Sequence, residues 1–180
     1  MGIEIEKKYR LTRDEREQLI GRLRESGATH ESEEFEENTL YAGNNLDAGK
    51  QVLRLRRVGG RAILTYKERG TSESAIRRHR EDETVVEDAE ALAAILDALG
   101  YKPALVYEKL RATWKLKGAE IVVDELPFGL FVEIEGEENI IIEAEQSLGL
   151  AKAEAEMATY PELTGRHGQK QGDVIEARFK

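Results

Sequence analysis

Charged and apolar residues alternate along several segments of this chain. In residues 3–10, Glu4, Glu6 and Lys8 fall on one face, whereas Ile3 and Ile5 fall on the other. A period of two is typical of a β-strand whose two faces meet different surroundings. The same alternation predicts further strands at residues 51–58, 62–69, 76–86, 105–116, 120–124 and 130–135, with a short strand at residues 39–42.

Four stretches have helical spacing instead. The clearest begins at Thr12, whose spacing to Glu15 is that of a capping box, and it ends at Gly27. The other three are expected at residues 88–100, at residues 140–148 and from about residue 152 to residue 159, before Pro161.

Short turns connect most of the predicted strands. Gly59-Gly60 and Lys117-Gly118 are hairpin signals, and residues 72–74 are expected to form a loop. Strands that follow one another through hairpins, without a regular alternation of strand and helix, favour an antiparallel sheet and the α+β fold class. The length of 180 residues fits a single domain over residues 1–180.

Composition narrows the kind of protein further. No apolar run approaches the roughly 20 residues of a membrane span, and the chain starts with charged residues, so we expect a cytoplasmic protein without membrane contact. The net charge of -9 argues against binding to nucleic acid. Because the chain has no cysteine, a metal would have to bind carboxylates, histidines or water.

The charged faces of the predicted strands carry the same kinds of residue throughout. One such face on its own is typical of an outer surface in water. Its recurrence on nearly every strand favours a closed barrel, in which charged faces line a cavity and apolar faces lie outward beneath helices. The interior would hold six cations and seven carboxylates: Lys8, Arg54, Arg56, Lys67, Lys109 and Arg111, with Glu4, Glu6, Glu81, Glu83, Asp124, Glu133 and Glu135.

Such an interior needs a ligand, because buried charges are costly unless they are paired. Arginine forks match phosphate oxygens, and lysines supply further positive charge. Carboxylates that repel one another are relieved by a hard divalent cation. A metal-bound polyphosphate meets both demands.

In chain order, the charged motifs are Glu4-x-Glu6-x-Lys8, Arg54-x-Arg56, Thr65-x-Lys67, Glu81-x-Glu83, Lys109-x-Arg111, Asp124 and Glu133-x-Glu135. This ordered set resembles the CYTH family of triphosphate tunnel metalloenzymes, from about residue 3 to residue 160. The resemblance implies a closed, eight-stranded antiparallel tunnel with helices packed outside.

The resemblance also assigns roles to these residues. The triphosphate would bind to Arg54, Arg56, Lys67, Lys109 and Arg111. Magnesium or manganese would bind to Glu4, Glu6, Asp124, Glu133 and Glu135, with Glu81 and Glu83 extending the acidic wall. The catalytic set would be Glu4, Glu6 and Lys8, and Lys8 would contact phosphate or help to position the attacking water.

The register of one strand is open. If residues 76–86 were shifted by one position, Arg78, Arg80 and Asp82 would face inward instead of Glu81 and Glu83, and we favour the two glutamates. No histidine is assigned a catalytic role.

The function also has alternatives. Hydrolysis of inorganic triphosphate or of an organic triphosphate, such as thiamine triphosphate, is favoured because it requires only residues that bind phosphate and metal. A class IV adenylate cyclase, which converts ATP to cyclic AMP and diphosphate, belongs to the same family. A non-catalytic polyphosphate-binding module is a third reading, and a homodimer is left open.

Overall fold

The computed structural model describes residues 2–70 and 75–180, so the loop expected at residues 72–74 lies outside the described residues. Ten strands and four helices occur within those ranges. The strands are β1 Gly2–Leu11, β2 Thr29–Gly43, β3 Gln51–Val58, β4 Arg61–Arg69, β5 Arg77–Val86, β6 Tyr101–Leu116, β7 Ala119–Leu126, β8 Gly129–Glu135, β9 Gln169–Gln171 and β10 Val174–Ala177. The helices are α1 Arg13–Glu25, α2 Ala89–Ala98, α3 Glu138–Ser147 and α4 Tyr160–His167.

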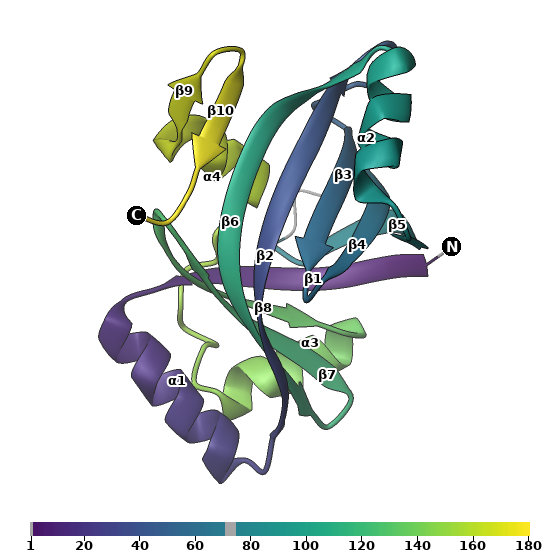
Figure 1. The fold of residues 1–180 in the computed structure, drawn as a ribbon. Helices are drawn as coiled ribbons and strands as arrows, with labels where there is room; N and C mark the ends of the chain where they lie inside the picture. Colours follow the sequence, from purple (N-terminus) through teal and green to yellow (C-terminus); the bar gives the residue numbers. More distant parts are fainter. Residues whose placement is uncertain (1, 71–74) are drawn as a thin grey trace.

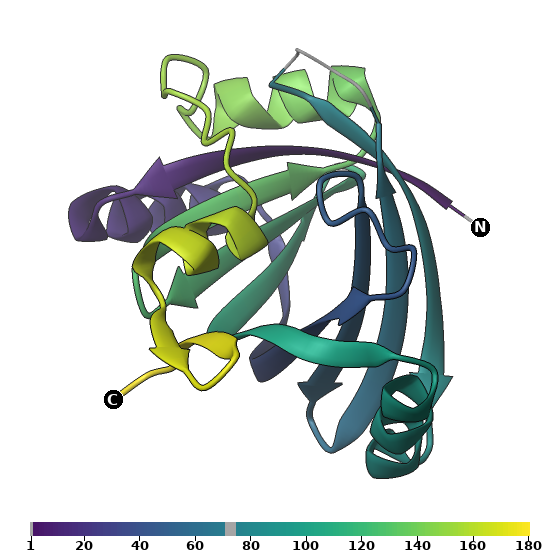
Figure 2. The same ribbon diagram turned by 90° about the horizontal axis from the view of Figure 1, so that it is seen from above.

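Eight of the strands form a closed antiparallel barrel. Their order is β2-β3-β4-β5-β1-β8-β7-β6, and pairing between β2 and β6 closes the ring. Figure 2 shows these strands surrounding a common centre. The short β10 adds to the outer edge of β6 in parallel and carries β9 beyond it. The predicted α+β barrel with helices outside is therefore confirmed.

The closing strands are longer than the sequence pattern predicted. β2 spans 15 residues instead of the four at 39–42, and it pairs with β6 from Thr29–Lys115 to Gly43–Tyr101. The prediction was too short because residues 31–37 are acidic on both faces, which hides the period of two. Glu36 nevertheless points inward and is 3% exposed.

Helix boundaries follow local capping. Thr12 and Glu15 form the predicted capping box at the start of α1. The helix predicted at about residues 152–159 is wrong, because that stretch is irregular and α4 begins only at Tyr160. Thr159 and Glu162 form a second capping box, and Pro161 occupies the first helical turn, where its missing N–H costs nothing.

The apolar faces of the barrel strands lie outward beneath helices. Figure 1 shows α1 and α3 below the barrel. Leu23 of α1 and Ile141 of α3 pack with outward residues such as Ile134. On another side, Leu96 of α2 packs with Leu55. Covering the outer faces in this way leaves the inner faces free for polar side chains. Among the described residues, no helix is long and apolar enough to cross a membrane.

We expect Gly43→Ala to destabilise the barrel strongly. Gly43 ends β2 with φ +131°, and a Cβ there would lie 2.2 Å from the carbonyl oxygen of Gly100. Backbone atoms cannot yield easily, so the free energy of unfolding should fall by about 3 kcal/mol or more. Urea unfolding measures this change. In the control Gly21→Ala, within α1, the added methyl meets no atom within 4 Å and stability should rise slightly; equal effects of the two substitutions would contradict the expectation.

Candidate functional site

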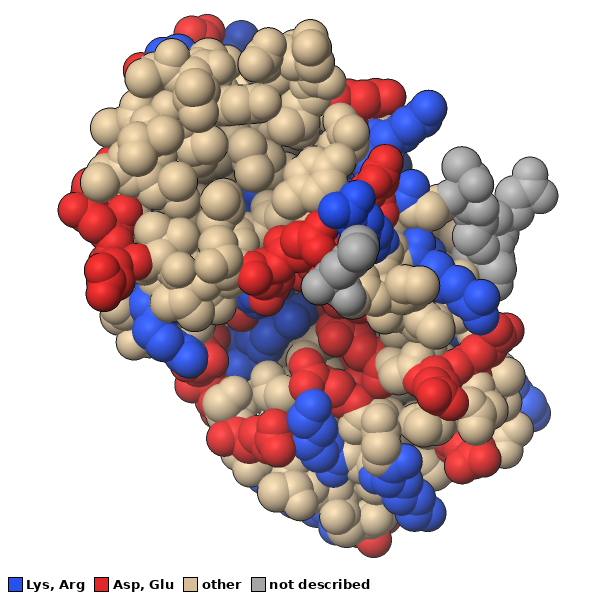
Figure 3. All heavy atoms as spheres, turned by 90° about the vertical axis from the view of Figure 1, so that its right-hand side faces the viewer, with Lys and Arg blue, Asp and Glu red and all other residues tan. Residues whose placement is uncertain are grey.

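The barrel encloses a cavity of about 240 Å³ that is lined mainly by charged side chains. Every site residue predicted from the sequence lines it except Asp124. Figure 3 shows a hollow on one face of the molecule in which basic and acidic side chains meet. The charged faces of the strands therefore point into the barrel, as predicted.

Strand β5 takes the register with the two glutamates inward. Glu81 and Glu83 line the cavity, and the side chains of Arg78 and Arg80 are 58% and 51% exposed. The same alternation turns His79 and Arg77 inward.

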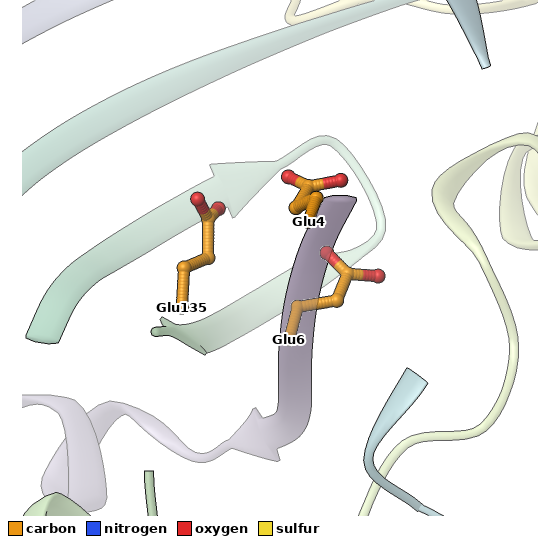
Figure 4. A group of neighbouring side chains, drawn as sticks. All are labelled: Glu4, Glu6 and Glu135. Atoms are coloured by element: carbon orange, nitrogen blue, oxygen red, sulfur yellow. The ribbon is translucent and has the colours of Figure 1, made fainter. Parts of the chain in front are cut away.

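Three carboxylates from neighbouring strands converge in the cavity. Glu4 and Glu6 lie on β1 and Glu135 lies on β8, where it is paired in register with Glu6. One oxygen of each lies within 4.8 Å of the others, and Figure 4 shows the three side chains gathered at one place. Below we call them the three-carboxylate group.

The electrostatics of this group suit a cation. Burial raises the pKa of Glu4 to about 7 against the opposing charge of Lys67, and the neighbouring Glu6 adds to the increase. Burial and the charge of Glu4 raise the pKa of Glu135 to about 8. Three neighbouring carboxylates repel one another when all are ionised, and a hard divalent cation such as Mg²⁺ or Mn²⁺ relieves this repulsion by binding their oxygens.

Glu6 differs from its two neighbours. Burial opposes its ionisation, but contact with His79 and the charges of Lys67 and Arg77 hold its pKa well below the usual range. Glu6 therefore stays negatively charged, whereas Glu4 and Glu135 are partly protonated at neutral pH.

Two other predicted metal ligands, Asp124 and Glu133, have basic partners elsewhere. Asp124 is fully buried and accepts two hydrogen bonds from Arg111, at 2.7 and 2.6 Å. Burial opposes its ionisation, yet Arg111 and Lys109 hold the pKa of Asp124 well below its usual range. Glu133 accepts a hydrogen bond of 2.8 Å from Arg111 and lies 3.8 Å from the ammonium of Lys8. The structure therefore brings these two carboxylates together with the basic residues instead of with the three-carboxylate group.

The basic residues predicted to bind phosphate lie on β3, β4 and β6 and line the same cavity. On β3, Arg54 and Arg56 both contact Glu83, at 3.4 and 2.8 Å. Beside them, Lys67 pairs with Glu4 and with Glu81.

On β6, Lys109 is 1% exposed and lies 3.3 Å from Glu36 and 3.6 Å from Asp124. Glu36 of β2 also lies 3.6 Å from Arg56 and thus links the basic residues of β3 and β6. Each of the predicted phosphate-binding residues has a carboxylate partner.

Sequence reasoning missed several residues of this site. Glu36 lay in an acidic stretch without a clear period, and Arg77 and His79 follow only once the register of β5 is known. Tyr160 gave no signal, although its hydroxyl donates to Asp124 at 2.8 Å and its ring centre lies 4.2 Å from Nζ of Lys8. α4 therefore begins at the cavity wall, where its first residue holds two charged groups.

The comparisons with known proteins agree with this geometry. The CYTH domain family matches residues 2–164. This chain belongs to the CYTH family. CYTH enzymes generally depend on metal ions, and the acidic cluster that such dependence requires is present here.

Similarity to individual proteins extends the comparison. A Methanocaldococcus jannaschii protein named "Putative adenylate cyclase" is 29% identical over 137 residues, which cover 74% of this chain and 76% of that protein. A solved Pyrococcus horikoshii structure is 26% identical with a TM-score of 0.79, covering 89% of this chain and 98% of its own. A solved Hippeastrum structure shares the fold at 16% identity and a TM-score of 0.66, covering 89% and 93%. The Hippeastrum protein is named a "Putative adenylyl cyclase" and is described as having a dominant triphosphatase activity.

The raised pKa values of Glu4 and Glu135 predict pH-dependent metal binding by this CYTH domain. Below pH 7 both carboxyls hold protons that a cation must displace, and above pH 8 they are ionised. The affinity for Mn²⁺ should therefore increase at least roughly tenfold from pH 6 to pH 8. Titration followed by the electron paramagnetic resonance of free Mn²⁺ measures it. Glu135→Gln should bind more weakly and with a smaller pH dependence; an affinity that stays constant over this range in the unsubstituted protein would contradict the prediction.

Proposed function

We propose that this protein is a metal-dependent hydrolase that cleaves a triphosphate compound, inorganic or organic, inside the barrel. The observation that carries the proposal is the joint presence, in one cavity, of the three-carboxylate group and of basic side chains from β3, β4 and β6. A long anion can contact several of these basic side chains at once, and a cation beside it balances the remaining charge.

Ligand binding would exchange partners within the cavity. Lys67 now pairs with Glu4, and Arg56 with Glu83. A phosphate group that contacts Lys67 releases Glu4, which is then free to bind the cation. The exchange avoids leaving Lys67 and Glu4 unpaired, because Lys67 gains the phosphate and Glu4 gains the cation; Glu83, which would lose Arg56, is 35% exposed and can be hydrated.

The metal would be held by Glu4, Glu6 and Glu135. When bound, the cation supplies charge neutralisation at the phosphate oxygens and makes a bound water more acidic. Asp124 and Glu133 fix the guanidinium of Arg111, so that its fork points at a defined place in the cavity. In this proposal Asp124 and Glu133 orient Arg111, whereas the sequence suggested that they bind metal.

Lys8 is the catalytic residue contributed by the basic side of the site. It is 2% exposed, and burial lowers its pKa despite the nearby charge of Glu133. The ring of Tyr160 lies against its ammonium group. A lysine held so closely can place one N–H toward a phosphate oxygen or an attacking water.

An adenylate cyclase is the second candidate, because the Methanocaldococcus jannaschii relative bears that name. Cyclisation requires a surface for adenine and a fixed ribose 3′-hydroxyl, whereas hydrolysis requires only phosphate and metal contacts. Tyr107 lines the cavity and is the obvious side chain for a base to meet, yet it is already packed near Tyr160. The Hippeastrum protein illustrates that the name and the main activity of a protein with this fold can differ.

A turnover assay tests the proposal. The purified protein is given inorganic triphosphate, thiamine triphosphate or ATP, each with Mg²⁺ or Mn²⁺, and phosphate, diphosphate and cyclic AMP are measured. We expect metal-dependent release of phosphate or diphosphate without cyclic AMP. Cyclic AMP as the main product from ATP would establish the cyclase instead. Tight binding of triphosphate without any product would establish a binding module.

Substitutions of the basic cavity residues should weaken substrate use. Arg54→Ala and Lys109→Ala each remove a charged donor, so kcat/KM should fall roughly tenfold or more. Steady-state kinetics with the best substrate measures the loss. Arg57→Ala is the matched control, because Arg57 lies on β3 with Arg54 but pairs with Glu90 on the outer surface.

On the acidic side, Glu135→Gln should mainly increase the metal concentration needed for half-maximal rate. Its effect can be measured in the same assay by varying Mn²⁺ at saturating substrate. Wild-type kinetics in Arg54→Ala, Lys109→Ala and Glu135→Gln together would remove the cavity from the reaction.

A further inference from the structure

Two side chains of β5 that the proposed reaction does not use are buried against the three-carboxylate group. Arg77 and His79 are 9% and 5% exposed and line the cavity. β5 pairs with β1 so that Arg77 lies opposite Glu6 and His79 lies opposite Glu4. Buried charged and polar groups are costly, so their presence here requires a partner that compensates for the cost.

Both side chains contact the same oxygen of Glu6. Nη2 of Arg77 lies 3.1 Å from Oε1, and Nε2 of His79 lies 3.5 Å from Oε1. Contacts that converge on one oxygen fix the direction of the carboxylate and leave Oε2 as the oxygen that can face a cation. Glu4 has a different kind of partner, since Lys67 divides its contacts between Glu4 and Glu81.

The remaining polar atoms of the pair argue against a purely structural role. Nη1 and Nη2 of Arg77 and Nδ1 of His79 are buried, and none of the three has a hydrogen-bond partner in the part of the chain that the structure describes, so that Nη2 contacts Glu6 as an ion pair only. A pair selected for stability alone would be replaced at little cost by apolar residues of similar size. The presence of two side chains with unbonded polar atoms is explained if their contact with Glu6 serves a function.

We propose that Arg77 and His79 are positioning residues that hold the Glu6 carboxylate in the orientation in which it binds the divalent cation. This inference rests on the proposed function, because it requires Glu6 to be a metal ligand. Side chains that orient a metal ligand from behind commonly change metal affinity by 10–100-fold when they are removed. We call the two residues the Glu6 brace.

The sign of the effect separates positioning from simple electrostatics. Arg77 carries a positive charge close to the metal site, so by charge repulsion alone its removal would strengthen the binding of a cation. If the brace orients Glu6, its removal weakens binding, because the carboxylate turns away or finds another partner. A change in metal affinity also separates positioning from a role in fold stability alone.

The test is Mn²⁺ binding by the full chain without substrate, followed by electron paramagnetic resonance. Arg77→Met and His79→Ala should each weaken binding at least roughly tenfold. His79→Gln keeps a side-chain N–H donor and should recover most of the affinity. Arg78→Met and Arg80→Met are the controls, since these arginines lie on the same strand but point outward, and they should bind Mn²⁺ like the unsubstituted protein.

Three further results define the outcome. Thermal unfolding without metal identifies variants that fail to fold, and for these His79→Gln and Arg77→Lys provide the decisive comparison with the outward controls. Unchanged or tighter Mn²⁺ binding in the folded brace variants, together with weak binding in Glu6→Gln, would overturn the brace and leave the proposed metal site in place. Unchanged binding in Glu6→Gln and Glu135→Gln as well would overturn the metal site itself, and the brace with it.

Discussion

Pairing of opposite charges inside the barrel is the interaction on which the rest of this structure depends. Lys109 and Asp124 are almost completely withdrawn from water, and a charge in that position is tolerated only beside a partner of opposite sign. The partners come from different strands, so the pairs fix how the strands are aligned around the ring. The outer faces contribute ordinary apolar packing beneath the helices, which supplies stability but would tolerate many alternative residues.

Inside the cavity the charge pairs fall into two kinds. Asp124 is fully buried and Tyr160 nearly so, and with the partly buried Arg111 they form a set with short hydrogen bonds, which gives a rigid end to the site. Lys67 and Glu4, by contrast, are partly accessible and divide their contacts among several neighbours. The rigid set orients hydrogen-bond donors, and the second set can exchange its partners. Together they allow a charged ligand to enter a cavity that already contains many charges. Membership of the CYTH family agrees with this use of the barrel.

The sequence predicted most of the barrel because each strand meets two different surroundings, which imposes a period of two on strands such as β3. The same reasoning failed where the period was hidden, as in the acidic first half of β2, and at residues 152–159, where a helix was predicted but the chain is irregular up to the start of α4. Most of the cavity lining followed from the charged faces and the family motifs. Tyr160 could not be foreseen, because its place depends on where α4 meets the barrel and not on any neighbour in the sequence.

The seam between β2 and β6 affects how the charged side chains become buried during folding. It joins segments far apart in the chain, whereas several other barrel pairs are hairpins between consecutive strands. Contacts between distant segments form slowly, since a long loop must be closed before they give any stabilisation. If the seam forms last, the charged strand faces stay hydrated until their partners arrive, and the folding chain does not bury lone charges.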